Sequence, residues 1–152
     1  MVKEFFYKNN KCSVPMEELI KNVNTFEEFE QKFSDEFLKE DDRIGEYLGD
    51  LIYKYGKDFS KVSADAGLTR AYVGNIVRGD KNNPKRDALI AICLAIGTTV
   101  EEVQYLLRYA GYSPLYVRRK RDVIIWFGFM KHKSRTEVNI DLEKRGFRIL
   151  GK

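Results

Sequence analysis

A glycine between two short apolar patterns constrains the fold of this chain most. Apolar residues recur at helical spacing over residues 59–66, and Gly67 then interrupts the pattern. A glycine at this place permits the positive φ that a sharp corner between two helices requires. Thr69 is a good N-cap for a second helix, which we predict over residues 70–78, with Gly79 ending it. Helix, glycine corner and capped helix together predict a helix-turn-helix unit.

The composition predicts a buried core and a polyanion-binding face. The 152 residues are 43% hydrophobic and 33% charged, with a formal net charge of +4. Residues 1–50 carry 7 Lys and Arg against 13 Asp and Glu, a net charge of −6, whereas residues 51–152 carry 20 against 10, a net charge of +10. A basic portion beside an acidic one is typical of a chain that binds a polyanion and keeps its acidic residues elsewhere.

Cysteine and histidine usage argues against a metal site, a cofactor and an enzyme. Cys12 and Cys93 lie too far apart in sequence for a metal knuckle or a redox motif, and Cys93 stands in an apolar helical pattern as a buried, reduced thiol. With one histidine, no zinc or haem site and no nucleophile–base constellation is expected. The longest apolar run, residues 123–130, is far below the ~20 residues that cross a bilayer, and no signal peptide is evident. We therefore expect a cytoplasmic chain without membrane association or cofactor.

An acidic helical extension is predicted for residues 1–43. Pro15 opens a short helix, and Thr25 and Glu28 form a capping box for the next one. That second helix carries a stripe of four aromatic side chains: Phe26, Phe29, Phe33 and Phe37. The stripe is predicted to be core or a partner contact rather than a cofactor site. The acidic face of the same helix is predicted to be a solvated surface, with repulsion or mimicry of DNA as the alternative.

Residues 44–109 are predicted to form five helices. The first covers residues 44–55, and the second and third are those of the helix-turn-helix unit. The fourth begins near Pro84 and ends at Gly97, and Thr99 caps the fifth, over residues 100–109. The fourth helix is expected to turn four residues inward: Leu89, Ile92, Cys93 and Ile96.

A basic helical extension is predicted for residues 110–152. It contains the cluster Arg118, Arg119, Lys120 and Arg121, followed by the apolar run of residues 123–130. Periodicity alone does not tell a buried helix from a strand in that run, but the helical surroundings and Asp122 in its first turn favour a helix. A second capping box, from Ser134 to Glu137, opens a last helix. Its apolar residues are Val138, Ile140 and Leu142, and a tail of Phe147, Ile149 and Leu150 is expected to pack back.

Several features of residues 44–109 occur in an order that resembles a known family. The run AGLTRAYVGNIVRG (66–79) is followed by Asn83-Pro84 and then by ALIAICLAIGTTVEEV (88–103). Ser63 stands four residues before the turn glycine. Together these features resemble the lambda-repressor-like helix-turn-helix proteins, also called the Cro/repressor or xenobiotic-response-element family. The resemblance implies an all-α, five-helix DNA-binding domain, here with extra helices at both ends. The run GYSPLYVRRKRDVIIWF (111–127) is also similar to a subgroup of bacterial helix-turn-helix proteins with a C-terminal helical extension.

The resemblance implies that the helix over residues 70–78 lies in the DNA major groove. The residues exposed on it would be Thr69, Arg70, Ala71, Tyr72, Gly74, Asn75 and Arg78. Arg70 would donate two hydrogen bonds to guanine, Asn75 would pair with adenine, and Ala71 would touch a thymine methyl group. The implied DNA-backbone contacts are Thr69, Tyr72, Arg78, Lys81, Asn82 and Lys85. Gly74 costs about 1 kcal/mol in helix propensity, which indicates a close approach to DNA or another backbone, or tolerance in a short helix.

Two positions depart from the family pattern, and one basic cluster has two interpretations. Phe59 stands where many relatives carry a glutamine, and Val77 stands where an acidic residue is common. The cluster over residues 118–121 either adds affinity for the DNA backbone or is a solvated helix start that docks the terminal helices. Like charges at a helix N-terminus oppose the helix dipole, so the second interpretation gives no reason for the placement.

The leading functional hypothesis is sequence-specific binding of double-stranded DNA by a bacterial or phage transcriptional regulator. The alternative is an antitoxin or adaptor that acts mainly through protein contacts made by its phenylalanine-striped helix. An enzyme is the weakest hypothesis. Because one recognition helix reads only a few base pairs, we expect a homodimer with the C-terminal helices at its interface. The sequence names no small-molecule effector.

Overall fold

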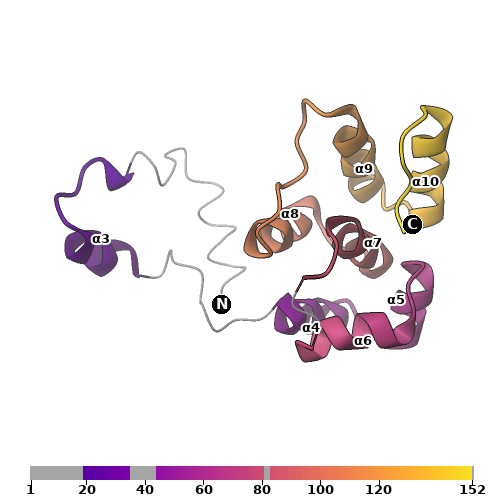
Figure 1. The fold of residues 1–152 in the computed structure, drawn as a ribbon, viewed down its shortest axis with the longest axis horizontal. Helices are drawn as coiled ribbons and strands as arrows, with labels where there is room; N and C mark the ends of the chain where they lie inside the picture. Colours follow the sequence, from indigo (N-terminus) through magenta and orange to yellow (C-terminus); the bar gives the residue numbers. More distant parts are fainter. Residues whose placement is uncertain (1–18, 35–43, 81–82, 152) are drawn as a thin grey trace. The chain divides into compact units, whose positions relative to one another are not determined.

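The computed structural model describes residues 19–34, 44–80 and 83–151. Their contacts divide the chain into two units, Met1–Asp41 and Asp42–Lys152. Eight helices and no strand lie in the described residues (Figure 1). The prediction of an all-α fold is therefore confirmed for the described residues.

Helix α3 (Phe26–Phe33) lies in the first unit and has the predicted N-cap, Thr25. Thr25 Oγ1 accepts a hydrogen bond from the Glu28 amide at 3.1 Å. The other half of the capping box is displaced by one residue, because Glu28 Oε2 accepts from the Asn24 amide at 3.2 Å rather than from that of Thr25.

The phenylalanine stripe of α3 is partly buried within its unit. The rings of Phe29 and Phe33 lie 4.9 Å apart between centroids, and Phe29 is buried. Phe26 is 61% exposed, so the stripe is not a continuous core contact in the described residues. Phe37, and Pro15 of the predicted preceding helix, lie outside the described residues.

Seven helices form the described part of the second unit. They are α4 (Ile44–Lys54), α5 (Phe59–Asp65), α6 (Arg70–Arg78), α7 (Arg86–Ile96), α8 (Val100–Tyr109), α9 (Lys120–Met130) and α10 (Arg135–Lys144). Five of them fall within residues 44–109, the number predicted. The N-caps predicted at Thr69, Thr99 and Ser134 form, since each side chain accepts a hydrogen bond from the amide three residues ahead. Asp58 caps α5 in the same way. The apolar run of residues 123–130 is helical, as Asp122 and its surroundings indicated.

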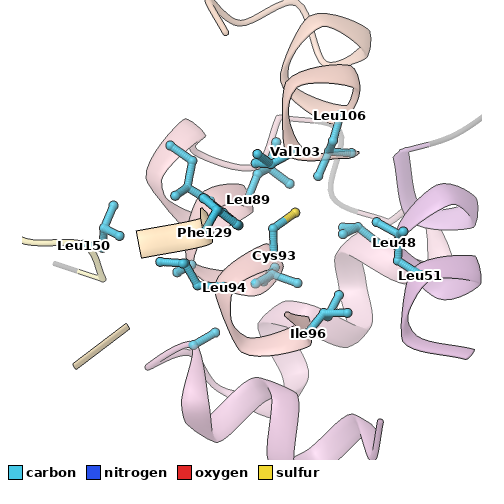
Figure 2. Packing of buried hydrophobic residues seen from close by; sticks show 14 of the residues in the cluster. Leu48, Leu51, Leu89, Cys93, Leu94, Ile96, Val103, Leu106, Phe129 and Leu150 are labelled. Carbon is cyan, nitrogen blue, oxygen red and sulfur yellow. The ribbon is translucent and has the colours of Figure 1, made fainter. Parts of the chain in front are cut away.

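Helix α7 is the centre of the second unit. The four residues predicted to face inward are buried, but so are Ile90, Ala91 and Leu94 on its other sides. A helix that is apolar all round must be covered all round. In Figure 1, α4, α5 and α6 lie on one side of α7 and α9 and α10 on the other. Figure 2 shows the result, with side chains from α4, α8, α9 and the tail converging on α7.

The C-terminal tail is fixed by a side-chain amide of α10. Asn139 Nδ2 donates to the Leu150 carbonyl oxygen at 3.0 Å, and its Oδ1 accepts from the Leu150 amide at 2.8 Å. Val138 and Leu142 are fully buried, but Ile140, which the sequence groups with them, is 49% exposed. Side chains four residues apart share a helix face, whereas those two apart do not. The C-terminal tail therefore packs back on the core, as predicted, but Ile140 contributes little to this packing.

Candidate nucleic-acid interface

The corner between α5 and α6 has the geometry that its glycine predicted. Gly67 has φ of 72°, and the Leu68 amide donates to the Ser63 carbonyl at 3.0 Å, which closes the end of α5. Thr69 Oγ1 then accepts from the Tyr72 amide at 3.0 Å and starts α6. The end of α5 and the start of α6 are thus each fixed by a local hydrogen bond.

The inner face of α6 packs on α4 at very short range. Val73 and Ile76 are fully buried. Gly45, in the first turn of α4, sits so close to α6 that an added Cβ would collide with the carbonyl oxygens of Ile76 and Val77. Sequence reasoning missed this glycine, because its role depends on a partner helix about thirty residues away. The close contact fixes where the outer face of α6 points.

The outer face of α6 presents polar and basic side chains. Arg70 and Ala71 are exposed, and Asn75 is partly exposed. Of the described helices of eight or more residues, α6 alone has no acidic residue in its first turn. The positive end of the helix dipole is therefore not neutralised by a side chain of its own first turn. These three residues, predicted to contact bases, lie outside the core, and Ala71 and Asn75, four residues apart, share a face of the helix.

Arg78 links the end of α6 into a hydrogen-bonded chain that the sequence did not predict. Its Nη2 donates to Asn75 Oδ1 at 2.6 Å, and its Nε donates to Asp80 Oδ2 at 3.2 Å. The guanidinium crosses Gly74, where an added Cβ would lie 3.0 Å from Arg78 Nη1. Gly74 was expected to be exposed, and this is wrong, because Arg78 covers it. The close approach that its glycine indicated is to a side chain of its own helix.

Two aromatic residues support the basic side chains of this surface. The Arg70 guanidinium lies over the Phe59 ring, with Cζ 5.8 Å from the ring centroid. Phe59 therefore provides an aromatic face against which the Arg70 guanidinium lies. Tyr72 Oη lies 3.5 Å from the amide nitrogen of Lys85, whose side chain is exposed. Lys81 and Asn82, the other predicted backbone contacts in that loop, lie outside the described residues.

The predicted basic patch over residues 118–121 divides into two parts. Arg118, Arg119 and Lys120 are exposed. Arg121 is mostly buried and forms a two-pronged ion pair with Asp87, at 2.9 and 3.2 Å. Its Nε also donates to a carbonyl oxygen of the tail. Arg121 therefore docks α9 on α7, which was the alternative interpretation of this cluster, and its guanidinium is not displayed for a ligand.

A second, reversed ion pair lies beside the first. Arg86 on α7 donates to Asp122 on α9 at 3.2 and 3.4 Å, and also to the carbonyl oxygens of Ser113 and Pro114. Adjacent residues of α7 thus carry a cation and an anion that meet an anion and a cation of α9. Each helix carries an arginine followed by an aspartate, and each arginine pairs with the aspartate of the other helix. This crossed pairing favours one register of α7 against α9 and disfavours a shift between them.

The C-terminal extension also contacts the helix-turn-helix corner. Arg135, the first residue of α10, donates through Nε to the Asp65 carbonyl oxygen at 3.1 Å and through Nη1 to the Leu150 carbonyl oxygen at 3.2 Å. Its guanidinium lies against Gly67, where an added Cβ would be 2.6 Å from Arg135 Cζ. The corner glycine is therefore favoured by its positive φ, and any side chain there would also displace the Arg135 guanidinium.

The described residues contain no group of three or more His, Cys, Asp and Glu side chains placed to hold a metal ion. Burial raises the pKa of the Cys93 thiol to about 12, so this cysteine is protonated and chemically unreactive at neutral pH. Among the described helices, none has the length and apolar character needed to cross a membrane.

Comparison of the chain with family models, with curated proteins and with solved structures found no match. The resemblance to the lambda-repressor-like proteins therefore stays a prediction.

Proposed function

We propose that this chain binds double-stranded DNA in a sequence-specific manner, with α6 in the major groove, and acts as a transcriptional regulator. The observation that carries the proposal is the division of α6 into two faces. Val73 and Ile76 fix the helix to the core, while Arg70, Ala71 and Asn75 lie on the side left open. A base-reading helix needs this combination of a rigid mount and an outer face with hydrogen-bonding groups.

The N-terminal half of α6 carries the groups suited to base edges. Arg70, held over Phe59, offers the two parallel donors that guanine O6 and N7 accept. Ala71 is a small apolar contact for a thymine methyl group. Asn75 Nδ2 remains a donor for adenine N7, while its Oδ1, which already accepts from Arg78, has a second lone pair for adenine N6.

The residues around the N-terminal half of α6 carry side chains that can bind DNA phosphates. Thr69 at the amide end of α6, Tyr72, Arg78 and Lys85 lie at the ends of the helix or in the loop after it, and Lys81 and Asn82 belong to the same loop in sequence. Arg78 has two roles in this proposal, since it both orients the Asn75 amide and offers charge to the DNA backbone. Asp80 holds it in that position.

Base-reading and backbone-binding variants should differ in a competition assay on duplexes selected from a random pool. Arg70→Ala and Asn75→Ala are each expected to weaken binding to the preferred site by about 1–3 kcal/mol and to relax the preference at one base pair. Lys85→Ala is expected to weaken binding to all duplexes alike. The assignment of roles is wrong if the two classes of variant give the same profile across sequences.

We expect the active species to be a homodimer, because a single α6 contacts too few base pairs to select a site. Exposed apolar side chains on the C-terminal helices support this expectation: Phe127 and Met130 on α9, and Ile140 on α10, are 49–52% exposed. Sedimentation velocity at micromolar concentration should give twice the monomer mass. A monomer both with and without DNA would leave α9 and α10 as an intramolecular brace only.

A second candidate function is supported by the first unit. Phe26 is 61% exposed on α3, whose first turn also carries Glu27 and Glu28, and Ile20, before this helix, is 54% exposed. An exposed aromatic side chain on an acidic helix suits a protein partner, as in an antitoxin or adaptor. Loss of partner capture in a Phe26→Ser variant that retains DNA binding would favour this function, and unchanged capture would remove it.

A further inference from the structure

A groove lined by apolar and basic side chains lies within the C-terminal extension. It has a volume of about 620 Å³ and lies between the start of α9 and the segment that follows α10. Its apolar lining comes from Val117, Val123, Ile124 and Phe147, and its cations are Arg118, Lys120 and Arg145. None of these residues belongs to the helix-turn-helix unit.

The groove has the size and lining of a small-molecule site. Ligand pockets usually enclose about 300–1,000 Å³ and combine apolar walls with a few polar groups. Val117 is 62% exposed and Phe147 is only partly buried. A ligand in the groove would remove these apolar surfaces from water, which favours binding in proportion to the area covered.

Two of the three cations that line the groove lack an anionic partner within the described residues. No acidic side chain is among the described lining residues, and neither Arg118 nor Lys120 forms an ion pair within the described part of the chain. Asp122, the acidic residue nearest in sequence to Lys120, is already paired with Arg86, and Asp141 is paired with Lys133. Glu143, two residues before Arg145, is exposed and does not line the groove. Arg145 Nη1 donates weakly to a backbone carbonyl oxygen at 3.4 Å. The groove therefore combines apolar walls with a positive potential, which comes mainly from Arg118 and Lys120.

From this combination we infer that the groove binds a small amphipathic carboxylate, that is, an apolar body carrying one anionic head. An inorganic anion would leave the apolar walls uncovered, and a neutral hydrophobe would leave the cations without a partner. A carboxylate with an alkyl or aromatic body satisfies both. The inference concerns a site other than α6 and does not depend on DNA binding.

Decanoate is a suitable probe, with decan-1-ol and inorganic phosphate as matched controls. In methyl-labelled full-length protein, decanoate is expected to shift the resonances of Val117, Val123 and Ile124 in a saturable manner. Decan-1-ol should bind about tenfold more weakly, because it lacks the charge-assisted contacts. Phosphate alone should leave these methyl groups unmoved.

Variants at two adjacent positions, Arg145 and Lys144, test whether the cations of the groove contribute to binding. Arg145→Gln is expected to weaken decanoate binding about tenfold, while Lys144→Gln, at the preceding exposed residue outside the lining, should leave it unchanged. Val117→Asp, at an exposed position where the fold tolerates a charge, should abolish binding. The inference is overturned if decanoate gives no shift, if decan-1-ol binds as tightly, or if phosphate or duplex DNA moves the same methyl groups as strongly.

Discussion

Gly45→Ala is expected to destabilise the second unit by about 3 kcal/mol, because the added Cβ would collide with two backbone carbonyl oxygens of α6. Backbone atoms cannot move aside as a flexible side chain does, so α4 and α6 would have to separate. Urea denaturation followed by circular dichroism would measure the loss as a lower midpoint with little change in slope. Because α4 packs against α6 and fixes its position, we expect DNA binding to weaken together with stability.

Gly49→Ala is the matched control on the same helix. An added Cβ there would meet only Val77 Cγ1 at 3.7 Å, an ordinary van der Waals contact. This variant should be neutral or more stable by up to about 1 kcal/mol, because alanine favours a helix. Equal stability of the two variants would mean that α4 and α6 are not in the close contact described above.

Glu102→Gln is expected to have a comparably large effect, about 3 kcal/mol at neutral pH. Glu102 is fully buried and accepts hydrogen bonds from Lys54 Nζ at 2.8 Å, from Tyr55 Oη at 2.5 Å and from the Thr99 amide at 3.0 Å. Burial alone would raise the pKa of Glu102, but the hydrogen bonds from Lys54, Tyr55 and Thr99 outweigh it and lower the pKa below 4.5.

The sign of this shift fixes the pH dependence. Because the pKa of Glu102 is lower in the folded state, its charge stabilises the fold fully above the ordinary value of 4.5, and this contribution is lost as the pH falls through the folded-state pKa. The difference in unfolding free energy between the wild-type protein and Glu102→Gln should therefore shrink on acidification. Glu101→Gln, at the exposed neighbour, serves as the control and should change little at any pH. A difference for Glu102→Gln that stays constant from pH 7 to pH 3 would contradict the account.

Local signals allowed most of the fold to be predicted. The caps at Thr69, Thr99 and Ser134 and the corner at Gly67 depend on hydrogen bonds and backbone angles within a few residues, which sequence pattern reports directly. The helical state of residues 123–130 was chosen correctly from its surroundings. These features needed no knowledge of what packs against them.

Features that depend on a distant partner could not be predicted in the same way. The pattern of α7 indicated one buried face, because nothing in its own residues says that α9 and α10 cover the other. The sequence left two interpretations of the basic cluster open, and Arg121 could be assigned to docking of the terminal helices only once Asp87, on another helix, was seen beside it. In the candidate site, the outward positions of Arg70 and Ala71 followed from helical period, but the Asn75–Arg78–Asp80 chain and the covering of Gly74 required side-chain positions.

Binding of the full-length chain to a random pool of duplex DNA across a salt series tests the central claim most directly. Fluorescence anisotropy should show binding whose logarithmic affinity falls linearly with the logarithm of salt concentration, as phosphate contacts displace counterions. Lys85→Ala should reduce the magnitude of that slope by about 1, and Lys144→Ala, on the last turn of α10, should leave it unchanged. Failure to bind any duplex at low salt, or an affinity that does not change with salt, would contradict the assignment of α6 as a DNA-reading helix.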